Sequence, residues 1–520
     1  MKSIINLLLF LNFSCLTMAQ SVFQSTFEGL GAERGYSVEV CDDGYLLVGS
    51  SNTSGAGQND VLVIKTDRDG LPVWKKTYGG FNDDSGRRVK RIHDNHFIIA
   101  GTTNSFTSDS MNFYVLKIDS MGGLLWSRIF GGPGQDSAIN FVETYDHGLL
   151  IVGTTNSIGA GMRDVYLLKL DSAGNYLWSK AIGNTGSEVA TSLIEMADHG
   201  FLITGYTNGF GFSGNTAFLL RVNEIGDVQW VKTIDPGTAW NSPRDVRAND
   251  IIKGYLNDYL VVGQECCGPV NDGRHFVLDI DSMANFNWMK DYQLNSGRGS
   301  AQSIVKSDDG NFITGGQYSS GAACALKIDV LGNNLWTWYY DAGQSYEIKT
   351  TADGQFVLAG YTPWVGDNVA YLIKPDGDGS LNCSSNLPFT GMIFSVNPTI
   401  SSQTFSSTTT NFGLWDSCQV SNSFINDSSL CLYTHVDDIR PGDLDIKIYP
   451  NPTDEYFTIS VYPFTGSFTL EILDALGRRV YIQKQIQATA IIEVGNLDPG
   501  LYYIKMRDER RIRMKQLVIK

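Results

Sequence analysis

The sequence has little charge and no long hydrophobic segment. Only 18% of its 520 residues are charged, and acidic residues outnumber basic ones enough to give a net charge of −16. A negative chain is repelled by nucleic-acid phosphates and by anionic lipids, so neither nucleic acid nor a membrane surface is expected as the main partner. Beyond the N-terminus no run approaches the roughly 18 apolar residues of a spanning helix, so no membrane span is expected.

Several catalytic and metal-binding patterns are also missing. The chain has no P-loop, no nucleophile elbow, no HExxH motif and no dinucleotide-binding glycine pattern. No Cys-x-x-Cys pair finds a matching partner, which argues against a structural zinc site. Of the eight cysteines one lies in the N-terminal segment, and the odd remainder leaves at least one thiol unpaired in an exported protein. Cys383, Cys418 and Cys431 lie together, where disulfides could tie that segment.

The first 19 residues have the order of a signal peptide. Lys2 is followed by the apolar run 4–13 and by a small-residue site ending at Ala19. This pattern predicts cleavage between Ala19 and Gln20. Cys15 raises the alternative of a lipoprotein, but the residues before it make a poor lipidation box.

A tryptophan recurs at nearly constant spacing, at Trp74, Trp126, Trp178, Trp230, Trp288 and Trp336. The gaps are 52, 52, 52, 58 and 48 residues. A glycine recurs with it, at Gly49, Gly101, Gly153, Gly205, Gly263, Gly315 and Gly360, which makes seven units. A period of this size indicates one supersecondary unit copied in an array.

Each unit reads as four short strands separated by Gly, Asp and Asn turns. In the first unit the predicted strands are 36–40, 45–49, 60–65 and 72–78. The predicted fold class is all-β, a seven-bladed β-propeller of about 52-residue repeats over 20–383. A solenoid is the alternative. Closure is favoured because residues 22–27 read as a spare fourth strand for the last unit, where Cys383 stands in the tryptophan position.

The turns carry a family resemblance. Gly131-Gly-Pro-Gly-Gln-Asp136, Gly148 and Gly153-Thr-Thr-Asn-Ser157 resemble a family of bacterial β-propeller repeats. The resemblance covers about 20–383 and rests mostly on turn residues. It therefore implies the fold and little about activity.

The repeat stops after residue 383. Residues 384–441 are rich in Ser and Thr and contain cysteine, so we expect a partly ordered linker. Residues 442–520 have alternating strands with Pro and Gly turns, which predicts a small C-terminal β-sandwich.

Several motifs of this last segment occur in a recognisable order: Tyr449, Pro450, Asn451, Pro452, Gly477, Pro499, Gly500, and the basic end Lys515 to Lys520. The set resembles the type A C-terminal sorting domain of the type IX secretion system of Bacteroidetes. The resemblance implies contact with that machinery and a secreted or outer-membrane cell-surface location. It also implies cleavage of the domain, followed by attachment to surface lipopolysaccharide or release.

The repeat provides an internal control for catalytic candidates. A residue that recurs in several units is expected to be structural, so His147 and His199 are interpreted as turn residues at the site of Asp43 and Asp309. The carboxylates Glu33, Asp84, Asp136 and Glu188 share one site and are expected to cap turn amides, with cation or sugar binding as the alternative. The lysines Lys65, Lys117, Lys169, Lys327 and Lys374 each precede an aspartate by two residues and suggest local ion pairs.

One loop has the spacing of a calcium ligand set. Asp376, Asp378, Ser380 and Asn382 present oxygen atoms at alternate positions. The glutamate that completes an EF-hand loop is missing, with Leu387 in its place, so calcium is the weaker alternative to no cofactor at all.

The fifth unit departs most from the repeat and carries the candidate binding residues Trp240, Arg244, Glu265, Asp272 and Arg274. Trp364 in the seventh unit adds an exposed aromatic group suited to a glycan. Simple drift of a surface loop explains the same departure.

The expected function is a secreted or surface-anchored binding or adhesion propeller without catalysis, with an extracellular glycan or protein as ligand. The first alternative is a polysaccharide-acting enzyme, which needs two carboxylates about 5–10 Å apart, with Asp245, Glu265 and Asp272 as candidates. The second alternative is a structural spacer without ligand.

Overall fold

The computed structural model describes residues 22–29, 31–53, 55, 57–106, 110–209, 214–235, 244–255, 257–267, 272–293, 299–318, 321–340, 342–362, 368–381, 392–396, 399–403, 406–409, 419–422, 430–433, 445–449, 453, 456–462, 468–473, 479–487, 489–507 and 512–519. The chain divides into two compact units, Met1–Tyr433 and Thr434–Lys520. The predicted signal peptide lies outside the described residues. No helix long and apolar enough to cross a membrane occurs in the described part of the chain.

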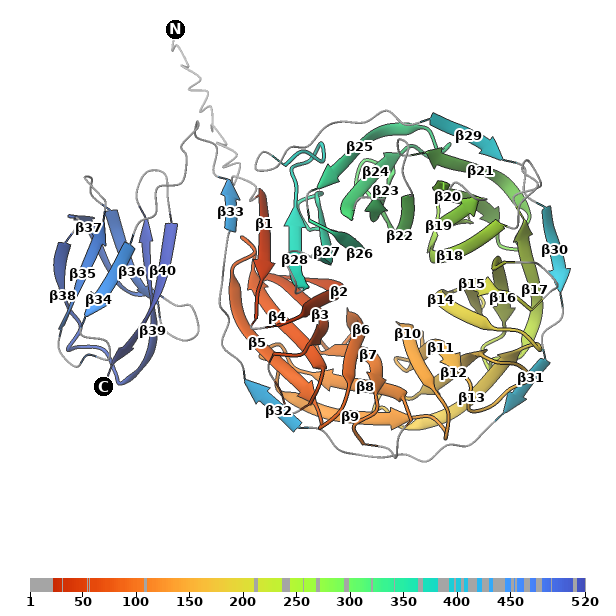
Figure 1. Ribbon diagram of the computed structural model, residues 1–520, viewed down its shortest axis with the longest axis horizontal. Coiled ribbons are helices and arrows are strands. Elements are labelled where there is room, and N and C mark those ends of the chain that lie inside the picture. The colour runs from red at the N-terminus through yellow and green to blue at the C-terminus, as the bar shows by residue number, and fades with distance from the viewer. Residues whose placement is uncertain are drawn as a thin grey trace, which may run out of the picture. The chain divides into compact units, whose positions relative to one another are not determined.

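Seven antiparallel four-stranded sheets form a ring, which confirms the predicted propeller (Figure 1). Blade 1 is β2 (Glu33–Cys41), β3 (Gly44–Ser51), β4 (Asp60–Asp67) and β5 (Pro72–Gly79); blade 2 is β6 (Asp84–Arg91), β7 (Phe97–Thr103), β8 (Asn112–Ile118) and β9 (Leu124–Phe130); blade 3 is β10 (Asp136–Glu143), β11 (Leu149–Thr155), β12 (Asp164–Leu170) and β13 (Tyr176–Gly183). Blade 4 is β14 (Glu188–Glu195), β15 (Phe201–Thr207), β16 (Thr216–Val222) and β17 (Val228–Asp235); blade 5 is β18 (Arg244–Lys253), β19 (Asp258–Cys267), β20 (Asp272–Asp281) and β21 (Phe286–Gln293). Blade 6 is β22 (Gly299–Lys306), β23 (Phe312–Tyr318), β24 (Ala322–Ile328) and β25 (Asn334–Tyr340); blade 7 is β26 (Gln344–Thr350), β27 (Phe356–Thr362), β28 (Val369–Lys374) and β1 (Val22–Phe27).

The N-terminal strand closes the ring, as the spare strand predicts. β1 pairs with β28 and sets Phe23 opposite Lys374, in the way that Trp74 stands opposite Lys65 in blade 1. The seventh equivalent of the tryptophan is therefore Phe23, and the assignment of Cys383 to that position was wrong. The reason is that the last outer strand comes from the start of the chain.

Each large ring packs on the glycine turn of the next blade. A Cβ atom on Gly122 (φ +69°) would lie 2.8 Å from the Trp74 ring, and one on Gly70 (φ +75°) would lie 2.4 Å from the Phe23 ring. The turn therefore needs glycine both for its left-handed backbone and for the close approach. This contact explains why a turn glycine such as Gly122 recurs opposite the ring, in addition to the second-strand glycine of each unit.

Every inner strand carries a β-bulge at the same place, and a polar residue follows it in each blade: Ser37, Arg88, Asn140, Ser192, Asp250, Ser303 and Glu347. Several of these side chains accept a backbone N–H of the next blade, as in Val89 N to Ser37 Oγ (3.0 Å) and Ile304 N to Asp250 Oδ2 (3.1 Å). The same register pairs Ala301 with Gly316, so Gly316 and not Gly315 is the repeated glycine of unit six. The bulge leaves donors unpaired, and the neighbouring blade satisfies them.

The Ser/Thr-rich segment after the propeller adds fifth strands to five blades. They are β29 (Met392–Val396) on blade 5, β30 (Thr399–Gln403) on blade 4, β31 (Ser406–Thr409) on blade 3, β32 (Gln419–Asn422) on blade 1 and β33 (Leu430–Tyr433) on blade 7. This belt runs round the ring in the reverse of chain order (Figure 1). The sequence suggested only a partly ordered linker, because the five strands are four or five residues long and three of them, β30, β31 and β32, are mainly polar. Their backbone groups cover outer strand edges that would otherwise be open to pairing.

The second unit consists of two antiparallel sheets. One contains β34 (Asp445–Tyr449), β35 (Tyr456–Tyr462) and β38 (Thr489–Glu493), and the other contains β36 (Phe468–Leu473), β37 (Arg479–Ile486), β39 (Gly500–Arg507) and β40 (Ile512–Ile519). A buried core with Phe457, Ile472 and Leu517 joins them. This arrangement agrees with the predicted small sandwich. Of the sorting residues, Tyr449 ends β34, Pro499 precedes β39, Gly500 begins it and Lys515 lies in β40. The others, Pro450, Asn451, Pro452, Gly477 and Lys520, lie outside the described residues.

Candidate functional site

The repeated lysines form ion pairs, but not with the aspartates that follow them. Lys169 Nζ lies 2.9 Å from Asp146 in the turn between the first two strands of its blade, and Lys117 Nζ lies 2.6 Å from Asp94. Arg221 takes the same role with Asp198 in blade 4. The predicted aspartate partner was wrong. The register of the hairpin, which cannot be read from the sequence, brings the turn between the first two strands next to the lysine on the third strand. These pairs hold turns in place.

His147 and His199 are turn residues, as expected, although not at the aspartate position. Both have left-handed backbones (φ +60° and +61°), like Asn95 in blade 2 and Gly310 in blade 6. The predicted counterpart Asp309 instead matches Asp146, since each aspartate pairs with its blade's lysine. The histidines therefore occupy a position that favours glycine or asparagine.

Three of the four repeated carboxylates accept turn N–H groups, whereas Glu33 accepts from Lys75 Nζ at 2.8 Å and from the Ser51 and Thr53 hydroxyls. Asp136 is fully buried and accepts from Gly132 N and from Ser157 Oγ, both at 2.7 Å. Asp84 and Glu188 make the corresponding contacts with Gly80 N and Asn184 N. Burial raises the pKa of Asp84 and of Glu188, against the hydrogen bonds that lower it. These contacts agree with the capping interpretation and use oxygens that a cation or a sugar would need.

The candidate calcium loop belongs to a turn present in other blades. Asp376 Oδ1 accepts from Ser380 N (2.8 Å), as Asp171 Oδ1 accepts from Asn175 N. Asp376 Oδ2 also accepts from Ser380 Oγ. Asn382 lies outside the described residues. The repeated turn accounts for Asp376 without a metal, and calcium at this loop stays an untested prediction.

The fifth blade exchanges two residues between neighbouring strands. In blade 3, Asp136 on β10 stands opposite Thr155 on β11; in blade 5, Val246 and Glu265 take these positions. Glu265 is 1% exposed, so it brings the buried carboxylate from the other strand. The candidate Glu265 is thus the counterpart of a structural residue, displaced by one strand.

The remaining fifth-blade candidates do not gather into a site in the described structure. Arg274 lies opposite Glu265 and pairs with Asp291 at 3.9 Å. Of Arg244 and Asp272 only the strands that carry them are described, and Trp240 and Trp364 lie outside the described residues.

The register also separates two carboxylates of the enzyme hypothesis. Asp245 pairs with Cys266, whereas Glu265 pairs with Val246. Paired residues share a face of a sheet and adjacent residues point to opposite faces, so Asp245 and Glu265 lie on opposite faces of β18–β19. Asp245 is engaged by Arg247, with Nη2 to Oδ2 at 2.8 Å. These two groups cannot act together on one glycosidic bond.

An aromatic and cationic cluster breaks the repeat at the inner strands. The bulged residue of the seven blades is Tyr36, Arg87, Ile139, Thr191, Asn249, Gln302 and Tyr346. The Tyr36 ring meets Tyr346 edge-on at 5.4 Å and Tyr361 at 6.0 Å, and Tyr346 stacks on Tyr361 at 5.4 Å. The Arg87 guanidinium lies 4.5 Å from the Tyr36 ring centre. We call Arg34, Tyr36, Arg87, Tyr346 and Tyr361 the tyrosine–arginine cluster.

The cluster is accessible and chemically versatile. Arg87 is exposed and the three tyrosines are half-buried. Arg34 donates to the Asn368 side-chain oxygen at 2.8 and 3.0 Å, and Tyr346 donates to Gln344 Oε1 at 2.8 Å. Aromatic faces, hydroxyls and a guanidinium can together stack on rings and bind hydroxyls or carboxylates. The sequence contains a signal for this cluster, but finding it requires aligning the units at their inner strands and not at their tryptophans.

A cavity of 380 Å³ lies beside the later half of the inner strands of blades 5, 6 and 7. Its lining includes Ser303, Glu347 and Lys349. Glu347 is already paired with Arg88 (2.9 Å) and Lys349 (3.4 Å), and these charges keep the pKa of Glu347 low although burial raises it. The acidic group of this cavity, Glu347, is therefore engaged in contacts between blades.

The sheets define the propeller unit as a seven-bladed β-propeller, and the second unit as a separate β-sandwich. Residues 447–520 match the family described as the secretion system C-terminal sorting domain. The protein is accordingly a propeller protein secreted by the type IX secretion system to the cell surface or the extracellular space. No curated protein matches the sequence.

Solved structures resemble the chain only distantly. They include the Dos1 propeller (16% identity, 63% of this chain and 74% of that chain, TM-score 0.37). PorZ, a surface component of the type IX secretion system of Porphyromonas gingivalis, gives 9% identity over 97% and 86% at a TM-score of 0.26. An endo-1,5-alpha-L-arabinanase from Thermotoga petrophila RKU-1 gives 10% over 68% and 100% at 0.28. Likenesses this weak carry no functional argument.

Proposed function

We propose that this protein is a non-catalytic binding or adhesion propeller, and that it binds an extracellular glycan at the tyrosine–arginine cluster. The supporting observation is the break in the repeat. Five blades have other residues at the position of Tyr36 and Tyr346, so the cluster is not required by the fold. The recurring carboxylates and lysines, in contrast, are engaged in capping and turn pairing.

The chemistry of the cluster favours a sugar with an acidic group. Tyrosine rings present flat apolar faces with a polar end, which suits the mixed surface of a sugar ring. Arg87 is exposed and offers planar donors that match a carboxylate. A protein ligand is the alternative that a binding screen would reveal.

The test is a binding and turnover screen with the full chain from residue 20, because the belt packs on the propeller. Neutral and uronic-acid polysaccharides would be offered, with R87A and Y36A as site variants and I139A as the matched control at the same bulge in blade 3. We expect saturable binding that weakens at least tenfold in R87A and Y36A and stays unchanged in I139A, without release of sugars.

Other outcomes separate the alternatives. Equal binding by all variants would move the site away from the cluster. Released oligosaccharides would favour the polysaccharide-acting enzyme, and absence of binding to any glycan or extracellular protein would favour a structural spacer. Contact with the secretion machinery, cleavage of the sorting domain and attachment to surface lipopolysaccharide belong to the same proposal and would be tested by locating the protein in cell fractions.

A further inference from the structure

Three consecutive inter-blade contacts share one geometry at the turns between the first two strands. In each, the last residue of one blade's inner strand contacts a turn residue of the preceding blade and the left-handed turn residue of its own blade. The three sets are Asp42, Arg91 and Asn95; His93, Glu143 and His147; and Tyr145, Glu195 and His199. The positions are structural, but the side chains differ.

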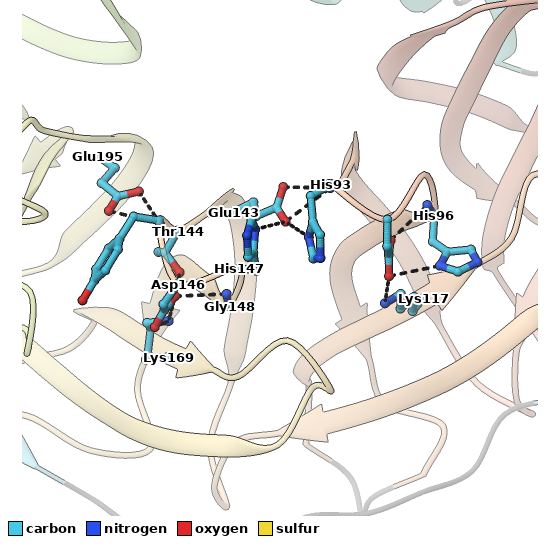
Figure 2. A network of polar contacts seen from close by, with 12 residues as sticks. His93, His96, Lys117, Glu143, Thr144, Asp146, His147, Gly148, Lys169 and Glu195 are labelled. Atoms are coloured by element: carbon cyan, nitrogen blue, oxygen red, sulfur yellow. Dashed lines mark hydrogen bonds and ion pairs between the residues drawn. The ribbon is translucent and has the colours of Figure 1, made fainter.

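The middle set brings two imidazoles and a carboxylate together (Figure 2). Glu143 accepts from His93 N at 3.1 Å and contacts His93 Nδ1. His147 Nδ1 lies 3.6 Å from Glu143 Oε1. The centres of the two rings lie 3.9 Å apart, and their planes are tilted by 31°. Both rings present Nδ1 to the Glu143 carboxylate.

These groups have the chemistry of a transition-metal site. One ligand atom from each of the three residues lies within 4.8 Å of the other two. Zinc binds imidazole nitrogen and carboxylate oxygen at about 2.0–2.2 Å, so small side-chain rotations bring the three atoms around one ion. The flanking sets cannot do this, because Arg91 carries a positive charge and Tyr145 replaces one imidazole.

The site is open to solvent. The side chains of His93 and His147 are 40% and 58% exposed, and that of Glu143 is 23% exposed. His147 is presented by its left-handed turn, a conformation that a β-carbon disfavours. Asn95 in blade 2 and Gly310 in blade 6 form the same left-handed turn, so the turn itself does not require a histidine.

We propose that His93, Glu143 and His147 form a Zn²⁺ site that joins the turns of blades 2 and 3. Blade 2 supplies one ligand and blade 3 supplies two, so the ion bridges neighbouring blades. Three protein ligands leave a coordination position for water or for a donor from a partner molecule. The inference does not depend on the glycan proposal, since the residues and the strands are different.

The test is calorimetric titration of the metal-free full chain with Zn²⁺ at pH 7.5. H93Y copies the third set and H147N copies the first set, so both retain side chains that the fold already accommodates. H199N is the matched control, because His199 has the same backbone conformation and the same glutamate contact. We expect one equivalent to bind the parent protein and H199N, with a loss of at least tenfold in affinity in H93Y and in H147N.

A variant that creates a second metal site tests the proposal without relying on a loss of affinity. Tyr145 is 57% exposed, and Y145H converts the third set to two imidazoles and a carboxylate. We expect a second equivalent of Zn²⁺ in Y145H and a higher melting temperature in the presence of the metal. Binding should weaken at pH 5.5, because the ligands must be deprotonated.

The proposal is overturned if the parent protein binds no Zn²⁺, or if H93Y and H147N bind it as tightly as the parent does. A loss of affinity in H199N equal to that in H147N would also overturn it, because it would place the metal elsewhere. Melting curves without metal identify a variant that fails to fold. If H93Y or H147N fails to fold, the number of Zn²⁺ equivalents bound by Y145H tests the proposal instead.

Discussion

Blades 3 and 5 have the same strand order and each accepts a belt strand, yet they differ at positions that the repeat otherwise keeps. Blade 3 has the buried Asp136 on its inner strand, whereas blade 5 has Val246 there and Glu265 on the next strand. The buried carboxylate therefore keeps its place in the blade while the residue that supplies it moves to the partner strand. Departure from the repeat in blade 5 is therefore not by itself evidence of a binding site.

Blade 5 also differs at three positions where blade 3 follows the pattern. His275 stands where blade 3 has Val165, Asp279 stands where it has Lys169, and Ala284 stands where it has Gly174. These assignments follow from the strand register and the turn positions. Each exchange replaces a favourable residue with one that burial or backbone geometry opposes, so blade 5 should be the less stable of the two.

The largest expected effect is the loss of the carboxylate in blade 3. D136A removes a fully buried carboxylate and leaves the half-buried donors Gly132 N and Ser157 Oγ without this acceptor. We expect the free energy of unfolding to fall by about 3 kcal/mol. Urea denaturation followed by tryptophan fluorescence measures it. S137A, at the half-buried neighbouring position of the same strand, should change stability by less than about 0.5 kcal/mol.

A double-mutant cycle in blade 5 tests whether Glu265 has taken over the role of Asp136. E265T removes the carboxylate, V246E adds a second one beside Glu265, and the pair V246E/E265T gives the arrangement of blade 4, in which Glu188 stands opposite Thr207. We expect both single variants to be destabilised and the double variant to recover at least about 1 kcal/mol relative to their sum. Additive losses would contradict the idea that Glu265 has taken over the role of Asp136.

Much of the propeller could be predicted because its repeats are local. The tryptophan and glycine spacing gave the blade number, and residues 22–27 indicated the closing strand. The belt could not be predicted, since its strands are only four or five residues long, share no common pattern and owe their structure to the edges they pair with. The two candidate sites were harder to predict than the belt. The tyrosine–arginine cluster and the set around Glu143 each join different blades, and the meeting of His93 with His147 depends on the turn register.

The second prediction concerns the turn pair that blade 5 lacks. Lys169 is 5% exposed and its Nζ donates to Asp146 and Thr144, each at 2.9 Å. K169M should lower the free energy of unfolding by about 2 kcal/mol, because Asp146 loses its buried donor. Burial raises the pKa of Asp146, but hydrogen bonds from the Thr144 hydroxyl, Lys169 and Gly148 N, together with the lysine charge, lower it to about 2.

The pH dependence gives a second measurement for K169M. A carboxyl whose folded pKa is depressed contributes stability above its unfolded pKa and loses it as pH falls toward the folded value. The parent protein should therefore lose this contribution between about pH 4 and pH 2, and K169M should lose less of it. An identical acid-dependent loss in both proteins would contradict the assignment. D279N in blade 5 is the contrast, since burial raises the pKa of Asp279 and its neutral replacement should not destabilise.

The third prediction removes a buried imidazole from blade 5. His275 is fully buried, and within the described residues neither ring nitrogen has a hydrogen-bond partner. H275V installs the residue of blade 3 and should raise the free energy of unfolding by about 1 kcal/mol at pH 7.5. Burial lowers the pKa of His275 to about 3. The unfolded state therefore takes up the proton first, and stability falls as pH drops from about 6.5 toward 3.

The gain from H275V should accordingly be larger at pH 5 than at pH 7.5. V165A in blade 3 is the control at the matching position, and its loss should not depend on pH, because no titrating group is changed. A gain in H275V that is the same at both pH values would show that the imidazole is not desolvated in the folded protein.

The smallest expected effect concerns the turn that packs on the preceding blade's tryptophan. Ala284 has a left-handed backbone (φ +55°), where blade 3 has Gly174 (φ +82°). A284G relieves the strain of the β-carbon, at the cost of more freedom in the unfolded chain, so we expect a gain of about 0.5 kcal/mol. Thermal unfolding of A284G and of A173G, the same exchange at a turn residue without a positive φ, separates the two contributions. A173G should be neutral or slightly destabilised, and a loss in A284G equal to that in A173G would mean that Ala284 carries no strain.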